Sequence, residues 1–520
     1  MLFGRITLFG SRTLFTKQEN RNILVYICGI MLYKFGIEAF NGAIITLATN
    51  RYDQDAHNNG ELTRTFEKVG LLIGLNQAAQ CFGSILISPL IKHWKTQVVL
   101  SATIFFFAFS TAIFMILDGT TGGTIKPRDF QPKNKNDFSY YGKYSTDLII
   151  PIYFASGIAF GMVESIRRVI PANIVGDDVN KLRKMDALVH VFYEIAGVSG
   201  ALMTALILIP RLGNNYAFIV TPILFACAGA IWLSIRSAPN ETNESENTLD
   251  IELKPLKGHF FRPIARALFA FLESLFVGAK IVFTSRKFLW LFAAYPLAVY
   301  SHRYIENSIA PQVARRYLHQ ADWSQILVGG SNFGELLGAL FVFIFSDSMK
   351  SPLLWVRIDA IALLVMWYIP FYNPPVNDIR HAWLIAATLI PVGFASAVGD
   401  ISLDSYIQSS LTRLESKNKD VSPLGAVMAF LYSTYIIIHS IANPFLGRYI
   451  DKAYNRTEHV HSALLFTVAV QLTISFSIMF ASTFVPKGSF GCNPVLIEDD
   501  DDDDDEKSVS RQTSNGEPNA

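Results

Sequence analysis

Charged side chains are scarce in this sequence, where Asp, Glu, Lys and Arg together make up 17% of 520 residues. An ordinary soluble domain carries about 25%. Cysteine is also rare, with four residues, three of them inside apolar stretches, which excludes a disulfide-stabilised secreted scaffold. The formal net charge of +1 leaves no basic footprint for nucleic acid. Together these absences argue against a soluble enzyme, a secreted module and a nucleic-acid-binding protein.

The signatures of common catalytic and nucleotide sites are missing as well. The sequence has no GxxxxGK[ST], HExxH, GxSxG or CxxC pattern. His459 and His461 form one HxH pair, but two ligands without a third do not define a metal site. We therefore expect no enzymatic activity, no cofactor, no bound metal and no ATP-driven step.

Apolar residues, in contrast, make up 51% of the chain and gather into blocks of roughly 20. That is the length a helix needs to cross about 30 Å of hydrocarbon. The blocks predict an all-α polytopic membrane protein. Its twelve transmembrane helices are predicted near residues 23–48, 69–91, 98–117, 148–170, 186–209, 218–235, 288–313, 326–345, 353–368, 384–406, 425–447 and 462–485.

One more apolar segment, 265–284, complicates this count. It carries Arg266, Glu273 and Lys280 at seven-residue spacing, which places them on one face of a helix. At the centre of a bilayer each charge would cost several kcal/mol. We therefore predict an amphipathic helix that lies in the membrane interface and keeps these charges in water.

The predicted chain organisation has five parts. They are a cytosolic arm at 1–22, an N-terminal six-helix half at 23–235, a cytosolic central loop with the interfacial helix at 236–287, a C-terminal six-helix half at 288–485 and an acidic disordered cytosolic tail at 486–520. Lys and Arg are enriched on the side that holds both ends of the chain, so the positive-inside rule places both termini in the cytosol. The basic start could also be a mitochondrial presequence, but a cytosolic arm is the favoured interpretation.

The two halves repeat each other in sequence. Gly83 precedes Lys92 by nine residues in the second helix, and Gly338 precedes Asp347 by nine in the eighth. The same offset of 255 matches further pairs, namely Gly74 with Gly329, Gln77 with Asn332 and Gln80 with Glu335. Such a parallel repeat of two six-helix units is the plan of one large class of transporters.

On these residues the chain resembles the major facilitator superfamily, over roughly residues 22–485. That family has a loop motif, G-x-x-x-x-x-P-L-x-D-R-x-G-R-K, which this sequence matches at Gly83 and Pro89. The acidic position of the motif holds Lys92, whereas Asp347 supplies an acid in the second copy. The resemblance implies a conformational gate built from these loops. The gate candidates are Gly83, Pro89, Lys92, Gly338, Asp347, Arg167 and Arg168.

The resemblance also implies that helices 1, 4, 7 and 10 line a central cavity. Ionisable groups within membrane spans are costly and therefore mark function. The substrate or proton candidates on these helices are Lys34, Glu38, Asn41, Glu164, His302, Arg303, Glu306, Asp400 and Asp404. Glu335 and Glu194 are further candidates, for which a packing role is favoured.

Lys34 and Glu38 are four residues apart and can pair on one helical face. Aligning the halves places Glu38 opposite Arg303, so we expect these two to meet, with Arg303 and Lys34 competing for the carboxylate. Proton binding to Glu38 could then be linked to opening of one side. A static ion pair that holds the halves together is an equally weighted alternative.

The favoured function is secondary active transport of a small polar or charged organic solute by alternating access. Protons are the expected coupling ion, and efflux is slightly favoured over uptake. We expect a monomer in the lipid bilayer of the plasma membrane or the vacuole, with no nucleic-acid partner. A solute sensor on the same fold is the alternative.

Overall fold

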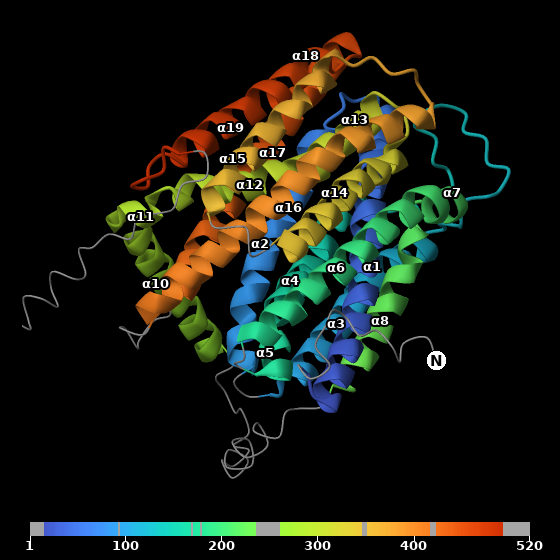
Figure 1. Ribbon diagram of the computed structural model, residues 1–520. Helices are drawn as coiled ribbons and strands as arrows, with labels where there is room; N and C mark the ends of the chain where they lie inside the picture. The colour runs from blue at the N-terminus through green and yellow to red at the C-terminus, as the bar shows by residue number, and fades with distance from the viewer. Residues whose placement is uncertain are drawn as a thin grey trace, which may run out of the picture.

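The computed structural model describes residues 15–91, 94–167, 170–176, 179–235, 261–345, 351–415 and 423–491. In these residues the chain is helical, without β-strands, and the helices form one bundle of long rods (Figure 1). Of the predicted gate candidates, Lys92, Arg168 and Asp347 lie outside the described residues, as do most of the N-terminal arm, much of the central loop and nearly all of the acidic tail.

The N-terminal half contributes six rods, some of which are interrupted by a short turn of 3₁₀- or π-helix. They comprise α1 (Lys17–Asn59), α2 (Thr65–Ile91), α3 (Thr96–Thr120), η2 (Thr146–Leu148) with α4 (Ile149–Arg167), α6 (Val179–Met203) with η3 (Thr204–Leu208) and α7 (Ile209–Leu212), and η4 (Ala217–Ile219) with α8 (Val220–Trp232). The short α5 (Ile170–Val175) lies between α4 and α6.

The C-terminal half is built in the same way. Its elements are α11 (Arg286–Leu289), α12 (Leu291–Tyr304), η5 (Ile305–Ile309) and α13 (Ala310–Arg316), then η6 (Ala321–Trp323) with α14 (Ser324–Phe345), α15 (Pro352–Ala362) with η8 (Leu363–Phe371), α16 (Ile379–Glu415), α17 (Pro423–Thr457), and α18 (His461–Leu464), η9 (Leu465–Val470) and α19 (Gln471–Ser482). The helix α10 (Phe261–Thr284) precedes them.

Ten helices in the described part of the chain are long and apolar enough to span a membrane. Taken together with the preceding α10, the α11–α13 rod counts as an eleventh span. Ala217–Trp232, at the position of the sixth predicted span, is a shorter apolar helix. The twelve predicted spans are consistent with this set. The observed helices often run past the predicted ends: α1 starts at a capping box formed by Thr16 and Glu19 and ends at Gly60, whose φ of 66° closes the helix.

The helix α10 meets the next rod at a bend of 108°. Glu273 and Lys280 are exposed on it, and so are Phe269 and Phe276, each 73% exposed. A helix that presents both charges and large apolar side chains to its surroundings suits a membrane interface. The interfacial placement of this segment stays a prediction.

Each half has its own apolar core. One cluster of buried side chains draws all its members from residues 23–235, around Phe40, whose ring contacts Phe107, Phe114, Tyr153 and Phe218. Two other clusters draw almost entirely on residues from 282 onward. Aromatic groups packed in this way supply much of the dispersion energy that holds helices together where lipid gives no hydrophobic drive.

The sequence repeat corresponds to a repeat in packing. A Cβ placed on Gly83 would lie 2.1 Å from the carbonyl oxygen of Ile158, where α2 crosses α4. A Cβ on the matched Gly338 would lie 2.7 Å from the carbonyl oxygen of Phe394, where α14 crosses α16. Both positions need glycine because the two backbones approach too closely for any side chain. The predicted gate glycines are thus close-packing positions in equivalent helix pairs.

Candidate functional site

A buried ion pair occupies the middle of α1. The Nζ of Lys34 lies 2.6 Å from Oε1 of Glu38, and the two side chains are about 10% exposed (9% and 11%). Their spacing of four residues places them on one face of the helix. The ammonium group also lies 4.6 Å from the ring centroid of Tyr193 on α6. Gly197, one turn further along α6, leaves room for Lys34, because a Cβ there would lie 2.7 Å from its Cε.

A second ion pair lies in the last turn of α4. Arg167 donates to Oε2 of Glu164 at 2.6 Å from Nη2, and Tyr33 donates to Oε1 of the same carboxylate at 3.1 Å. The guanidinium carbon of Arg167 lies 4.6 Å from the Tyr193 centroid. The Tyr193 ring therefore contacts two cations, Lys34 and Arg167, which belong to different ion pairs.

The C-terminal half holds a buried histidine between two carboxylates. The Nε2 of His302 lies 2.9 Å from Oε1 of Glu335 and 3.4 Å from Oε1 of Glu306. Arg303 donates to the other oxygen of Glu306 at 3.3 Å. Glu306 belongs to η5, a turn of π-helix that follows α12 directly. Such turns occur often at functional sites, because the wider backbone turn reorients a side chain.

These clusters lie where the two halves meet. A Cβ on Gly197 would be 3.5 Å from the Lys34 Nζ and 3.5 Å from the Nδ2 of Asn332, so α1, α6 and α14 converge at this glycine. Glu194, one turn before it on α6, is 6% exposed, and its Oε2 accepts no hydrogen bond. The arrangement gathers carboxylates, a lysine, an arginine and a histidine on facing helices of two halves.

The predicted contact between Glu38 and Arg303 is not the one that this conformation makes. Glu38 pairs with Lys34 and Arg303 pairs with Glu306, each within its own helical rod. Local spacing decided these pairs, since a partner three or four residues away is in reach whatever the two halves do. In this conformation Glu38 has Lys34 as its partner, and the expected competition of Arg303 for the same carboxylate in another state stays a prediction.

The remaining predicted residues have more ordinary surroundings. The Oδ1 of Asn41 accepts a hydrogen bond from the Tyr153 hydroxyl at 3.4 Å. Asp400 and Asp404 are half-buried on α16. Pro89 lies near the end of α2, within its last turn. Glu335 and Glu194 deserve more weight than their sequence positions suggested, because packing brings Glu335 to His302 and leaves Glu194 buried without a hydrogen bond at Oε2.

A separate polar cluster closes one end of the bundle. Asp53, near the end of α1, is 2% exposed and accepts bonds from Arg315 Nε at 2.7 Å and from Arg316 at 3.0 and 2.9 Å. Thr65 at the start of α2 donates to the same carboxylate at 2.5 Å. We call these four residues the Asp53 cluster. It joins α1 and α2 of one half to α13 of the other.

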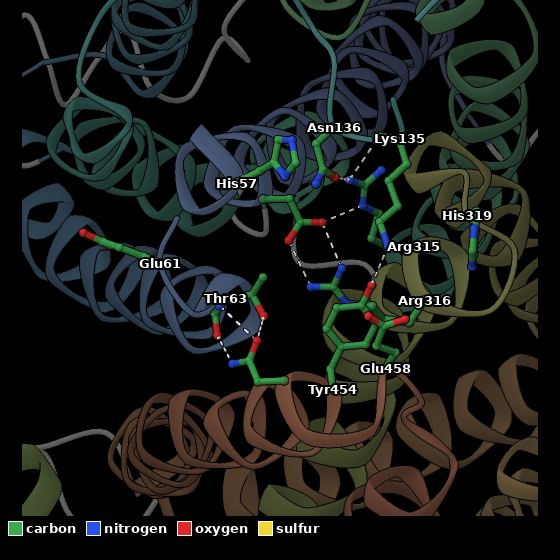
Figure 2. A pocket seen from close by; sticks show the side chains of 12 residues that line it. His57, Glu61, Thr63, Lys135, Asn136, Arg315, Arg316, His319, Tyr454 and Glu458 are labelled. Atoms are coloured by element: carbon green, nitrogen blue, oxygen red, sulfur yellow. Dashed lines mark hydrogen bonds and ion pairs between the residues drawn. The ribbon is translucent and has the colours of Figure 1, made fainter. Parts of the chain in front are cut away.

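The Asp53 cluster lies beside a cavity of about 240 Å³, whose polar lining is drawn in Figure 2. Arg316 stacks over Tyr454 of α17 at 4.0 Å, and Lys135 from the loop after α3 donates to the Tyr454 hydroxyl at 3.1 Å. Asn455 and Thr63 exchange hydrogen bonds of 2.7 to 3.1 Å. Side chains from both halves thus interlock around this cavity. Figure 1 shows α13 and α18 at this end of the bundle and α5 at the opposite end.

No local spacing predicts the Asp53 cluster, although its arginines lie in a segment that has a matching copy in the other half. The segment 49–52 (TNRY) of the first half matches 314–317 (ARRY) of the second, 265 residues further along. Arg51 of the first segment binds Asp118 of its own half at 3.3 Å. The matching ARRY segment contains Arg316, which binds Asp53 of the opposite half. Equivalent arginines therefore have an internal partner in one half and a partner across the interface in the other.

Two pseudo-symmetric helical halves, with ionisable groups buried between them and an interlocked end, are the plan of one class of membrane transporters. The model of the Major Facilitator Superfamily matches residues 26–417, and the chain belongs to that family. No curated protein matches the chain by sequence.

Solved structures share the fold at low sequence identity. A D-xylose–proton symporter aligns with a TM-score of 0.57 at 12% identity, over 89% of this chain and 96% of the other. A mutant of the nucleoside transporter NupG aligns with 0.53 at 12% identity, over 88% and 100%. The peptide transporter POT in complex with sulfate gives 0.52 at 12% identity, over 89% and 94%. Its membership in the Major Facilitator Superfamily and its apolar helices make the chain a multi-pass membrane transporter for a small-molecule solute rather than an enzyme.

Proposed function

We propose that this transporter moves a small polar or charged organic solute by alternating access, coupled to protons. The observation that carries the proposal is the buried Lys34–Glu38 pair at the point where α1, α6 and α14 converge. The proton affinity of a carboxylate in a low-dielectric site depends strongly on its solvation and on nearby charges. Lys34 and Glu38 share one helix and stay together, but α14 belongs to the other half, so movement of the halves would carry α14 away and change the surroundings of the pair.

The Asp53 cluster supports the alternating-access part of the proposal. Its ion pairs join the halves at one end, and they must break before that end can open. With both termini in the cytosol, this end is the outer one, and the described conformation is closed to the outside. Export is the proposed direction, because the segments 166–188 and 195–202, from helix 4 into helix 5, resemble the corresponding part of family members that export drugs or siderophores.

The test uses purified protein in liposomes that contain a pH-sensitive dye. A pentose, a nucleoside and a dipeptide, which are the solute classes of the structural neighbours, are applied as inward gradients at two pH values. We expect at least one solute gradient to move protons together with solute. Glu38→Gln should keep exchange of labelled solute but lose the proton signal, because the amide cannot titrate.

Removing one partner of a buried pair destabilises a protein by about 3–5 kcal/mol, so Glu38→Gln alone could fail for reasons of folding. The double variant Lys34→Gln/Glu38→Gln removes both charges and is the matched folding control. Glu61→Gln, at an exposed position beyond α1, controls for the loss of a carboxylate as such. Proton movement that persists in the stable double variant contradicts the coupling role of Glu38.

A further inference from the structure

The histidine between two carboxylates in the C-terminal half has the composition of a metal site. His302, Glu306 and Glu335 each offer one ligand atom, and these atoms all lie within 4.8 Å of one another. The three residues come from two rods, since α12 and η5 hold the first two and α14 holds Glu335. From these residues we infer that the protein binds one divalent first-row transition-metal ion here, contrary to the expectation of no metal from the sequence.

The separation of the ligand atoms suits such an ion. Nitrogen and oxygen ligands bind zinc at about 2.0–2.2 Å, which places neighbouring ligand atoms about 3.4 Å apart in a tetrahedron. The His302 Nε2 lies 2.9 Å from Glu335 Oε1 and 3.4 Å from Glu306 Oε1. The two carboxylate ligand atoms lie within 4.8 Å of each other, so a closure of at most about 1.4 Å brings all three atoms to the spacing of a bound ion.

One ligand atom of the site has no hydrogen bond. Glu306 is 6% exposed, and its Oε1, the oxygen nearest to His302, accepts no hydrogen bond. A buried carboxylate oxygen without a donor costs free energy that a cation would recover. Arg303 binds only the other oxygen, Oε2. The Nδ1 of His302 also lacks a hydrogen bond, so the ring can carry its proton there and present a bare Nε2 to the metal.

Charge and ligand chemistry select the ion. Two carboxylates and a neutral imidazole carry two negative charges, which a dication neutralises inside a low-dielectric region. Magnesium and calcium prefer oxygen ligands alone. An imidazole together with carboxylates favours zinc, manganese, iron(II) or cobalt(II). The competing occupant of the same space is a proton on His302, which would bridge the two carboxylates in the absence of metal.

The experiment measures cobalt(II) binding to full-length protein in detergent, from which any polyhistidine tag has been removed. We expect one ion per chain with the visible absorption of a nitrogen- and oxygen-ligated site, displaced by zinc but not by a hundredfold excess of magnesium. The acidic run at the end of the chain can also bind metal, so every comparison is made between proteins that share it. This wild-type measurement does not depend on whether any variant folds.

His302→Gln, Glu306→Gln and Glu335→Gln should each weaken cobalt binding at least tenfold, because even the loss of a group that only holds a metal ligand in place costs about 10–100-fold. His439→Gln removes a buried histidine outside the triad, and Asp118→Asn removes a buried carboxylate that binds Arg51 within the N-terminal half; both should bind cobalt within about threefold of the wild type. Absence of the cobalt band in the wild type, or equal losses in the triad and control variants, overturns the inference. Neither result depends on whether solute transport is proton-coupled.

Discussion

Replacing Asp53 by Asn should release the interlocked end of the bundle. The carboxylate is 2% exposed and binds both Arg315 and Arg316, so the amide leaves two buried guanidinium groups without their counter-charge. Breaking a buried ion pair in this way costs about 3–5 kcal/mol. Because opening this end returns the arginines to water, the cost falls on the closed state. The ratio of open to closed protein should therefore rise by about 10²- to 4 × 10³-fold, at 1.4 kcal/mol per tenfold.

The assay is labelling of a buried cysteine from the side of the Asp53 cluster. Gln325 on α14 suits this purpose, because it is 4% exposed and its side chain packs at Gly42 of α1, between the halves. Gln325→Cys is placed in a background without native cysteines, and a membrane-impermeant maleimide is added outside cells. Asp53→Asn should raise the labelling rate at least tenfold over the same protein with Asp53 intact.

The matched control is Asp55→Asn, two residues further along the same helix. Asp55 is exposed, so its replacement should leave the labelling rate within about twofold. The reasoning is refuted if Asp53→Asn labels no faster than its parent, or if Asp55→Asn accelerates labelling equally. Labelling that is faster only from the opposite side of the membrane would refute the assigned orientation.

Three further outcomes are expected. Gly83→Ala should lower the unfolding temperature, because its Cβ would lie 2.1 Å from the Ile158 carbonyl oxygen and overpacking costs about 1–3 kcal/mol. Arg357 donates to the backbone carbonyl oxygens of Ser489 and Gly491. Truncation after Gly491 keeps both bonds and should leave solute transport intact, whereas truncation before Ser489 removes both and should not. Burial and the nearby cationic side chains lower the pKa of His319. The unfolded chain therefore binds a proton at this residue more readily than the folded protein, so the free energy of unfolding should decrease as the pH falls below 6.5.

Each of these outcomes has a control. Phe82→Leu, next to Gly83 but partly exposed, should unfold within about 1 °C of the wild type in thermal scans. A protein truncated after Gly491 that is folded but transports no solute would favour the sensor alternative. For His319, the difference in unfolding temperature between pH 7.5 and 5.5 should shrink in His319→Gln, and an unchanged difference would contradict the assignment.

The positions of the spans could be predicted because each depends on a local property. A run of about 20 apolar residues satisfies its own backbone within one helix, whatever the rest of the chain does. Lys34 and Glu38 were predictable as a pair for the same reason, since a spacing of four residues fixes their contact. The helical ends were less certain, because polar turns such as the last part of α1 continue beyond the apolar stretch.

Tertiary structure alone decided the contacts between distant segments. Asp53 meets Arg315 across 262 positions, and His302 meets Glu335 across 33, through helix packing that no local spacing encodes. The sequence repeat correctly aligned the two halves, yet it placed Glu38 opposite Arg303, whereas each side chain binds a neighbour on its own rod. Composition and periodicity determine which segments become buried helices, but the choice of partner depends on the relative placement of the halves, and that placement changes between the states of a transporter.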